Sequence, residues 1–507
     1  MKKKILICDD EKNILILASR ILDEAGYETQ ICLDSKSMIR ELGKSKFDLV
    51  LTDMYLNNET GIGVFKEIKE KLNIPFILFS ASSDAGLSKK AFDNGFRDFL
   101  KKPFGKVDLV TRVQNTINQY EHKQLIEDKN EQFNQELVMA AKLQKELSPD
   151  WITKSGQIYS SYVSKAATQM SGDLFGVYEL DKEQSLFVMG DVSGHGVASA
   201  ILSIGVRNFI SNFTRAKGVK CLSTLVEDVN KHICDIYDGQ LYMTMVFVLM
   251  NSTTLEAEIV SAGHKFIYKK NKSGFKNIGD RLKCGIPLGW DRDANFQDIN
   301  LFSLSKDEAL FLCTDGISGE VINEEKLFSF LNSEVNNAFS LKNLEIPFNI
   351  SKKAFELSEI GDDLTAVVIT PENRNLNVHN GVIQNLDDVY DLATCLEKKD
   401  IGRSLGMMKA TSFSLIVSEW AGNLLKYVND SFDKTIYFEI NYDLERLTFY
   451  HRTPPHKLSK IDKPEFCTDS GRGGHIIHSL ANHEVKSCGS GLFIESFSLK
   501  AEEKLCV

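Results

Sequence analysis

Three aspartates near the start of the chain stand where two apolar segments end. Asp9 and Asp10 follow the apolar run 4–8, and Asp53 follows the apolar run 49–52. Carboxylates that gather at one place repel one another unless a divalent cation neutralises them, and Mg²⁺ prefers oxygen ligands. A carboxylate beside Mg²⁺ can accept a phosphoryl group. The sequence therefore predicts a magnesium-dependent phosphorylation site with Asp53 as the acceptor.

Strands that alternate with helices must bring these side chains together. Two further apolar segments, at 76–79 and about 98–100, are followed by Ser80 and by Lys102. This alternation predicts an α/β doubly wound parallel sheet, in which ligands bind at the carboxyl ends of the strands. We therefore expect all of these polar groups to line one crevice.

Residues 1–120 resemble the receiver domain of bacterial two-component response regulators, on the motifs just described. The resemblance implies that Asp53 is the phospho-acceptor and that it binds Mg²⁺ together with Asp9 and Asp10. It also implies that the backbone carbonyl of Tyr55 is a metal ligand. A sensor histidine kinase is the implied phosphodonor.

The same resemblance gives roles to residues on the later strands. Ser80 would hydrogen-bond the phosphoryl group, Lys102 would form an ion pair with it, and Phe99 stands at the position of the aromatic switch. Asn57 occupies a position where many receivers have proline. This departure concerns the geometry of a loop and leaves the chemistry of the pocket intact.

The bulk composition limits the class of protein. The 507 residues suffice for three or four domains, and 43% hydrophobic with 26% charged residues is typical of globular chains. A net charge of −10 argues against nucleic acid as a partner. Ten cysteines without a CxxC pair indicate reduced thiols. The apolar run after Lys2–Lys4 is too short for a signal sequence, and we find no apolar stretch of membrane-spanning length, so we expect a cytoplasmic protein without a membrane partner.

A helical connector is predicted between the first domain and the rest of the chain. Residues 106–148 contain no Gly or Pro, and we assign 121–149 to the connector itself. Phe133, Leu137 and Ala140 lie on an apolar stripe of near-heptad spacing that Gln144 interrupts. The segment is either a solvated spacer helix or a parallel coiled coil that transmits the state of the receiver. We favour the coiled coil, and hence a homodimer.

A second set of aspartates lies in four loops that are far apart in the sequence. They are Asp173, Asp191, Asp315 and Asp362, each next to a glycine and close to an apolar segment. Carboxylates at the ends of several strands are typical of sites that hold two hard cations a few ångströms apart. Such a pair of ions binds a phosphate and activates a water molecule. The sequence thus predicts a metal-dependent phosphoryl hydrolase.

Residues 150–372 resemble the PPM family of metal-dependent serine/threonine phosphatases, closest to its bacterial sporulation and stress branch. The resemblance implies an α+β fold, a β-sandwich flanked by helices, with two Mg²⁺ or Mn²⁺ ions. Asp191 would bridge both ions and Val192 would add its carbonyl oxygen. Asp173, Asp315 and Asp362 would complete the shell. The implied substrate is an anti-sigma-factor antagonist, a small phosphoprotein.

Three further residues near these motifs have less certain roles. Asp363 adjoins Asp362, and the resemblance makes it a neighbour of the metal shell. His195 and His264 could act as acid or base catalysts, or they could be structural residues of their loops. We interpret both histidines as structural.

The last part of the chain, 376–507, combines a helix with a glycine-rich turn. Glu419 and Asn423 are four residues apart, so they share one face of a helix. Glycines that precede a helix suit a polyphosphate, because free backbone N–H groups point at the anion. The glycines concerned are Gly471, Gly473 and Gly474. Together these features predict a nucleotide site.

This arrangement resembles the anti-sigma-factor serine kinases of the GHKL ATPase family, which have an α/β-sandwich fold. The resemblance implies that Asn423 binds Mg²⁺ of ATP, that Glu419 is the general base, and that the three glycines contact the phosphates. The chain departs from the family where it reads His451–Thr453 instead of Asp-x-Gly. Three interpretations stay open: an active kinase with altered nucleotide contacts, a nucleotide-free docking module, or a structural domain.

Taken together, the motifs predict a multidomain, phosphorylation-controlled phosphatase in a partner-switching pathway. It would dephosphorylate a serine or threonine of the antagonist, and 376–507 would rephosphorylate that residue or bind the antagonist or a sigma factor. The alternative is a binding protein that sequesters a sigma factor or antagonist through a non-catalytic C-terminal domain. A DNA-binding regulator is disfavoured, because we find no helix-turn-helix module after the receiver.

Overall fold

The structure of the protein is a computed structural model. It describes residues 2–499 except 57–58, 61–62, 66–72, 81–92, 94, 238, 272, 319–341, 358–360, 373–377, 398–406, 428–434, 442–443, 453–479 and 489–491. The chain divides into two compact units, Met1–Glu136 and Leu137–Val507. Each unit is described by itself.

The first unit contains the predicted parallel sheet. Its five strands lie in the order β2-β1-β3-β6-β7, and all pairs of neighbours are parallel. The strands are β1 (Lys4–Cys8), β2 (Glu28–Cys32), β3 (Leu49–Asp53), β6 (Phe76–Ser80) and β7 (Asp98–Lys101). The helices include α1 (Lys12–Glu24) and α2 (Ser35–Lys44), and β4 (Tyr55–Leu56) pairs with β5 (Glu59–Thr60). The doubly wound fold is confirmed, with β2 as an edge strand that our sequence analysis did not include.

Helix α5 (Lys106–Glu146) is 41 residues long and includes most of the predicted connector. Its first turns are anchored in the first unit by Leu109, Val113 and Ile117, which are buried. Farther along, apolar side chains are exposed: Phe133 is 56% and Leu143 is 53% exposed. The predicted helix is therefore confirmed, and its second half presents an apolar face that nothing in the described residues covers.

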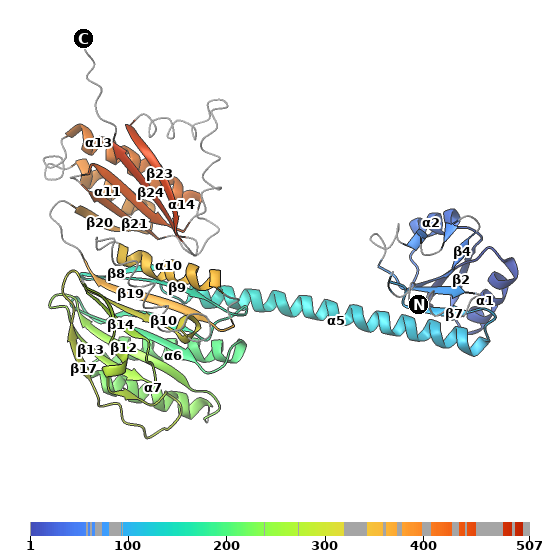
Figure 1. Ribbon diagram of the computed structural model, residues 1–507, viewed down its shortest axis with the longest axis horizontal. Helices are drawn as coiled ribbons and strands as arrows, with labels where there is room; N and C mark the ends of the chain where they lie inside the picture. Colours follow the sequence, from blue (N-terminus) through green and yellow to red (C-terminus); the bar gives the residue numbers. More distant parts are fainter. Residues whose placement is uncertain are drawn as a thin grey trace, which may run out of the picture. The chain divides into compact units, whose positions relative to one another are not determined.

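The second unit begins with a β-sandwich of two six-stranded sheets (Figure 1). One sheet has the order β10-β11-β12-β13-β16, with β17 beside β13, and the other has the order β15-β14-β18-β19-β9-β8. Large apolar side chains such as Phe175, Phe187 and Leu312 fill the space between them. The strands of the first sheet are β10 (Leu174–Glu179), β11 (Gln184–Val192), β12 (Met243–Asn251), β13 (Glu256–Ala262), β16 (Cys284–Gly285) and β17 (Asn300–Ser303). Those of the second are β8 (Ile152–Ser155), β9 (Ile158–Lys165), β14 (Ile267–Asn271), β15 (Gly274–Asn277), β18 (Ala309–Cys313) and β19 (Leu364–Pro371).

Helices flank the sandwich on both outer faces, as predicted. Helices α6 (Val197–Lys217) and α7 (Leu222–Tyr237) pack on the first sheet through an apolar cluster that includes Val206 and Val229. Helix α10 (Lys342–Leu357) packs on the second sheet. Two short helical segments, η1 (Gly279–Arg281) and α8 (Asp315–Ser318), complete this part.

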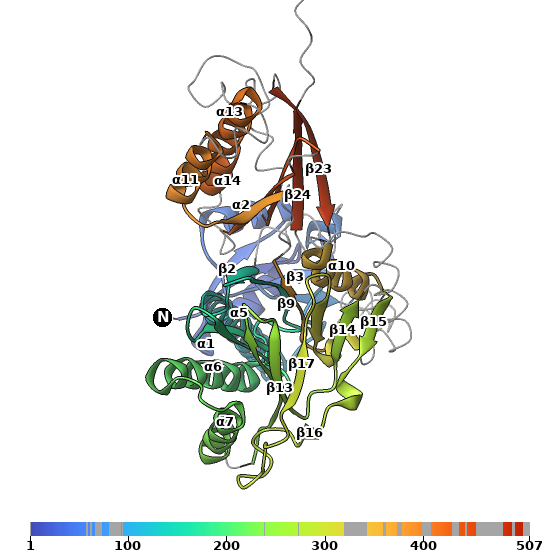
Figure 2. The ribbon, with the colours of Figure 1, turned by 90° about the vertical axis from the view of Figure 1, so that its left-hand side faces the viewer.

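The C-terminal part is a two-layer α/β sandwich (Figure 2). Five antiparallel strands have the order β20-β21-β22-β24-β23, and the helices cover one face. The strands are β20 (Val378–Ile383), β21 (Ile436–Asn441), β22 (Arg446–His451), β23 (Ala481–Cys488) and β24 (Leu492–Leu499). The helices are α11 (Leu386–Glu397), α13 (Met407–Ile416) and α14 (Gly422–Tyr427), the last two joined by the π-turn η2 (Val417–Ala421). The helix predicted to carry Glu419 and Asn423 is present, but it is interrupted by the π-turn, which contains Glu419.

The other face of this sheet shares a core with the β-sandwich. Successive side chains of a strand point to opposite faces, so Phe438 faces the helices while Tyr437 faces the sandwich. There Tyr437 packs edge-on against Tyr159, with ring centroids 5.4 Å apart. The indole N–H of Trp151 donates a buried hydrogen bond of 2.8 Å to the carbonyl of Thr435. The two parts of the second unit are thus joined by an apolar interface that contains a buried hydrogen bond.

No helix in the described part of the chain is both long enough and apolar enough to cross a membrane.

The shared core predicts a large effect of a single truncation. Phe348 of α10 is fully buried and packs edge-on against Trp151, with centroids 5.7 Å apart. We expect Phe348→Ala to destabilise the second unit by about 3–5 kcal/mol, the cost of an aromatic-sized cavity. Urea unfolding followed by tryptophan fluorescence measures this, because all three tryptophans lie in the second unit. Leu301→Ala, at a side chain 79% exposed, should change stability by less than about 0.5 kcal/mol. Equal midpoints for the two variants would contradict the interface.

Candidate functional site

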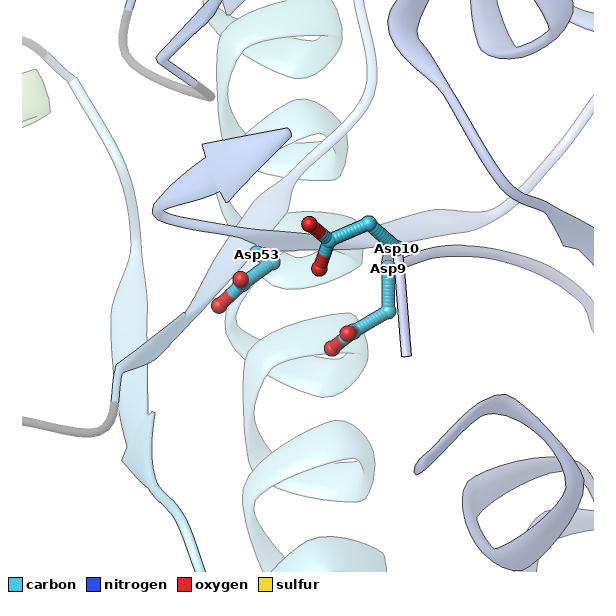
Figure 3. Close-up of side chains that lie close together, drawn as sticks. All are labelled: Asp9, Asp10 and Asp53. Atoms are coloured by element: carbon cyan, nitrogen blue, oxygen red, sulfur yellow. The ribbon is translucent and has the colours of Figure 1, made fainter. Parts of the chain in front are cut away.

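The receiver aspartates meet at the carboxyl ends of β1 and β3. Ligand atoms of Asp9, Asp10 and Asp53 all lie within 4.8 Å of one another, and Figure 3 shows the three carboxylates side by side. Asp9 is fully buried, Asp53 is 8% exposed and Asp10 is exposed. The cluster therefore has one open side through which an ion and a phosphodonor could reach it.

Lys102 provides the positive charge of this pocket. Its Nζ lies 2.7 Å from Oδ2 of Asp9 and 3.2 Å from Oδ1 of Asp53. Burial raises the pKa of Asp9 and of Asp53, and Lys102 opposes both shifts. Burial works against the charged form of Lys102, but its bonds to the two carboxylates outweigh this and raise its pKa. Three carboxylates beside one lysine leave an excess of negative charge, which fits a divalent cation.

The remaining predicted receiver residues lie close by in the chain. Tyr55 follows β3 and its side chain is 59% exposed, so only its backbone could serve the pocket. Phe99 lies on β7, where the guanidinium of Arg112 stands 5.8 Å from its ring centre. Ser80 ends β6, but its side chain lies outside the described residues, as does Asn57.

The four phosphatase aspartates come from both sheets of the sandwich. Asp173 immediately precedes β10, Asp191 lies near the end of β11, Asp315 follows β18 and Asp362 lies two residues before β19. Strand β11 continues past Asp191, which pairs with Thr244, to Val192. Our prediction that Asp191 lies in a loop was therefore wrong. Interstrand pairing fixes the backbone at Asp191 more firmly than a loop would.

Burial and mutual repulsion dominate the electrostatics of this set. Burial, then the charge of Asp363, raises the pKa of Asp173 to about 8, although hydroxyl donors oppose the shift. Burial and the charges of Asp173, Asp315 and Asp362 raise the pKa of Asp191 to about 10. The pKa of Asp315 is raised for the same reasons. Among the described groups that act most strongly on these three carboxyls there is no lysine or arginine.

These observations test whether metal ions fit the site. No three of these ligand atoms, within the described residues, lie as close as 4.8 Å to one another. Oxygen ligands of one Mg²⁺ lie about 2.0–2.1 Å from the ion, so a set this wide exceeds a single coordination shell. A wide set of carboxylates that runs from the buried Asp173 to the exposed Asp315 and Asp362, with no described lysine or arginine among the groups that act most strongly on it, fits two divalent cations.

Two side chains hold the aspartates in place. Thr314 donates its hydroxyl to Oδ2 of Asp173 at 3.0 Å and accepts the N–H of Thr365 at 2.9 Å. Asp363 is 2% exposed and accepts the N–H of Ala167 at 2.8 Å and the N–H of Gly172 at 2.5 Å. Both carboxylate oxygens of Asp363 thus accept hydrogen bonds from backbone N–H groups of the segment before Asp173. In this structure Asp363 stabilises the conformation of that loop.

A close backbone approach explains one glycine of the site, and a positive φ explains another. A Cβ on Gly316 would lie 2.1 Å from the carbonyl oxygen of Asp363, so only glycine allows Asp315 to approach this loop. Gly194, in the loop after Asp191, has φ of +82°, a conformation that side chains disfavour.

The two histidines differ in their surroundings. His264 is 3% exposed, and burial lowers its pKa to about 4, so its imidazole is neutral at pH 7. Its Nδ1 lies 3.5 Å from the hydroxyl of Thr244, the residue paired with Asp191. This place under the site suits the structural role that we predicted for His264. His195 is exposed on the loop before α6.

In the C-terminal part, the predicted nucleotide site is only partly described. Glu419 lies half-buried in the π-turn, and Asn423 lies on α14 with its side chain outside the described residues. Gly471, Gly473 and Gly474 also lie outside them.

His451 is committed to a buried hydrogen-bond network. Its Nε2 lies 3.0 Å from Oε1 of Glu495, whose Oε2 lies 2.8 Å from Nε2 of His483. His451 and Glu495 are each 1% exposed. Burial raises the pKa of Glu495, but the two histidines lower it by more, so its pKa falls below the usual range.

Comparison with known families agrees with the two sites. Residues 5–114 match the response regulator receiver domain, and residues 181–372 match stage II sporulation protein E (SpoIIE). The chain therefore carries a receiver domain fused to a SpoIIE-type domain.

Individual relatives show the same two parts. The chain is 27% identical over 187 residues to the phosphoserine phosphatase RsbP of Bacillus subtilis, covering 36% of this chain and 45% of RsbP. It is 29% identical over 126 residues to the response regulator ArlR of Staphylococcus saprophyticus, and the match covers 25% of this chain and 57% of ArlR. The structure of the SiaA-PP2C domain of Pseudomonas aeruginosa aligns with a TM-score of 0.41 and 15% identity. The alignment covers 48% of this chain and 99% of the SiaA domain. The chain spans about half the length of the curated relatives that it matches.

Sequence reasoning did not assign three residues of the phosphatase site. Thr314 received no role, and Asp363 was assigned only as a neighbour of the metal shell. Gln144 was noted only for interrupting an apolar stripe, although its amide bonds the backbone of Ser171, two residues before Asp173. A polar residue that breaks a regular apolar pattern was the available signal.

The raised pKa values predict that metal binding releases protons. Without metal, the raised pKa values favour protons on the carboxyls of Asp173 and Asp191. Mn²⁺ must displace them, so its affinity should rise from pH 6 to pH 8. Calorimetric titration with Mn²⁺ in two buffers of different ionisation enthalpy measures the number of protons released on binding. The variant Asp191→Asn lacks a ligand of the phosphatase site, so the heat that it retains is that of the receiver site. A heat of binding that does not depend on the buffer would contradict this prediction.

The same shifts set how the metal-free stability depends on pH. The native state binds these protons more tightly than the unfolded chain, in which the pKa is about 3.8. Their contribution to stability is therefore present below about pH 4 and is lost as the pH rises through 8 to 10. Thermal unfolding in chelator should accordingly show a lower midpoint at pH 9 than at pH 6, and Mn²⁺ should remove most of this difference.

Proposed function

We propose that the protein is a phosphorylation-controlled response regulator that removes phosphate from a phosphoserine or phosphothreonine of a protein. The observation that carries the proposal is the set of four aspartates from both sheets. Three of them, Asp173, Asp191 and Asp315, have raised pKa values, and no described lysine or arginine is among the groups that act most strongly on them. Carboxylates that lie near one another without a lysine or arginine destabilise the ionised site unless metal ions bind there. Two hard cations in such a site are suited to phosphoryl transfer.

The residues of the phosphatase domain divide into those that would bind ions and those that hold the ligands. Asp173, Asp191, Asp315 and Asp362, with the carbonyl of Val192, would hold two Mg²⁺ or Mn²⁺ ions. When bound, these ions supply charge that binds the phosphate and activates a water molecule for attack on phosphorus. Thr314 and Asp363 keep Asp173 in place through the hydrogen bonds described above. His264 contacts Thr244, the residue that pairs with Asp191, and would have a structural role.

In the receiver domain, Asp53 would accept a phosphoryl group from a sensor histidine kinase. Asp9, Asp10, Asp53 and the carbonyl of Tyr55 would hold Mg²⁺. Lys102 already contacts Asp53, so it is placed to pair with the phosphoryl group, and Ser80 would donate a hydrogen bond to that group. Phe99 would change its side-chain conformation when Asp53 is phosphorylated and so alter the surface of the receiver.

The proposed substrate is an anti-sigma-factor antagonist in a partner-switching pathway. Support comes from the similarity to the phosphoserine phosphatase RsbP and from the match to SpoIIE. We also propose the division into 1–120, 121–149, 150–372 and 376–507, and pairing of two chains through the exposed apolar face of α5.

Loss of the bridging aspartate should abolish activity. We expect Asp191→Asn to lower phosphate release from a phosphoserine peptide with Mn²⁺ at least about a hundredfold, because ion-derived charge stabilisation is worth several kcal/mol. Asp293→Asn, at an exposed loop position of the same domain, is the matched control and should keep full activity. Equal rates for the two variants would refute the proposed active site.

A second function, in the C-terminal domain, has two candidate forms. It would either rephosphorylate the antagonist with ATP-Mg, using Asn423 and Glu419, or bind the antagonist or a sigma factor without catalysis. The network of His451 with Glu495 favours the binding form, because the imidazole occupies the position expected for the adenine-contacting aspartate and is already bonded. The sandwich-facing side of the sheet is covered, so a partner would bind elsewhere on the domain.

Binding of ATP by the full chain distinguishes the two forms. The full chain is the right sample, since a fragment 376–507 would expose the core that it shares with Trp151 and Phe348. The binding form predicts no saturable ATP heat with Mg²⁺. Saturable binding that Asn423→Ala removes, and that Asn482→Ala at an exposed position keeps, would instead establish a nucleotide site.

A further inference from the structure

We infer that Gln144 is a positioning residue for the phosphatase reaction: it fixes the loop Ser171–Asp173, so that the register of α5 sets the affinity of the site for its metal ions. The inference rests on the proposed function, because it assigns regulation to the same site. Four steps lead from α5 to the carboxylate of Asp173.

The first step is the contact between the helix and the loop. The side-chain N–H of Gln144 donates to the carbonyl of Ser171 at 2.6 Å, and the backbone N–H of Ser171 donates to the amide oxygen of Gln144 at 3.1 Å. One amide thus satisfies both backbone groups of one residue. This two-point contact fixes both the position and the orientation of the peptide, which a single hydrogen bond would not.

The second step ties the end of α5 to α6. The same N–H of Gln144 lies 3.3 Å from the hydroxyl of Ser203, and that hydroxyl lies 3.4 Å from the carbonyl of Ser171. About one turn further along α6, Arg207 donates to the carbonyl of Leu147 at 3.0 Å. The last turn of α5 is therefore held by α6 and by the loop together.

The third step leads from Ser171 to the metal ligand. The N–H of Asp173 donates to the hydroxyl of Ser171 at 3.1 Å. On its other side, the loop is held by Asp363 through Gly172, and the carboxylate of Asp173 is held by Thr314. Gln144 is the support that comes from α5, whereas Thr314 and Asp363 belong to the sandwich.

The fourth step is the sensitivity of this contact to movement of the helix. One residue of an α-helix corresponds to a rise of 1.5 Å and a rotation of about 100°. A hydrogen bond of 2.6–3.1 Å is lost when its atoms separate beyond about 3.5 Å. A shift of α5 by even one residue would therefore break both bonds to Ser171. Since α5 is continuous from Lys106 to Glu146, a change at its start can reach this contact.

The experiment compares two glutamines of the same helix in the full chain. Gln144→Ala removes the contact, and Gln135→Ala makes the same chemical change at an exposed position. Calorimetry measures Mn²⁺ binding, with Asp191→Asn identifying the heat of the receiver site. We expect Mn²⁺ binding about tenfold weaker in Gln144→Ala, the size of about one net hydrogen bond, and unchanged in Gln135→Ala. Gln144→Glu should also weaken binding, because a carboxylate cannot donate to the carbonyl of Ser171.

The maximal rate separates positioning from a loss of folding. At saturating Mn²⁺, Gln144→Ala should recover the phosphatase rate of the intact protein, which a misfolded site could not do. The same Mn²⁺ affinity in Gln144→Ala, Gln144→Glu and Gln135→Ala would overturn the inference. So would a reduced rate that saturating Mn²⁺ does not restore. If the intact protein binds Mn²⁺ but hydrolyses no phosphoserine peptide, the proposed function fails, while the calorimetry still decides the role of Gln144.

Discussion

Like charges held together in buried pockets are the constraint on which both sites of this protein depend. Two carboxylates about 4 Å apart near a protein surface repel each other by about 4 kcal/mol. The receiver pocket offsets this repulsion with Lys102, which contacts both Asp9 and Asp53. In the phosphatase pocket, protons take that role at neutral pH, since the pKa of Asp191 is raised to about 10. The first pocket is therefore assembled before it binds a cation, whereas the second needs cations to ionise.

In the second pocket, hydrogen bonds hold the carboxylates close together although their charges repel one another. Thr314 and Asp363 belong to the two segments of the second sheet that carry Asp315 and Asp362. Gln144 belongs to a helix outside the sandwich. Because each support comes from a different element, the position of Asp173 depends on several parts of the fold at once. Such a loop is a natural place for control, since a small displacement of one support changes how well the carboxylates fit the ions.

Much of this could be predicted from the sequence, because the ligands themselves follow apolar strands. The parallel order of the first sheet follows from Asp9, Asp53 and Lys102 standing at strand ends, and the glycines beside the phosphatase aspartates marked close approaches. The supports could not be predicted, because contacts such as Gln144 with Ser171 or His451 with Glu495 join residues far apart in the chain. A polar residue in an apolar stripe signals that a partner exists but does not identify it. The shared core around Trp151 was equally hidden, since its apolar residues look like those of any separate domain.

The central claim is that the state of Asp53 controls the phosphatase site. The most direct measurement is the rate of phosphoserine-peptide hydrolysis at sub-saturating Mn²⁺, with and without beryllofluoride as a mimic of the phosphoryl group. The account predicts that beryllofluoride changes the rate of the intact protein, in either direction, and leaves the rate of Asp53→Ala unchanged. A rate that is the same with and without beryllofluoride in the intact protein, once its binding at Asp53 has been verified, would contradict the account.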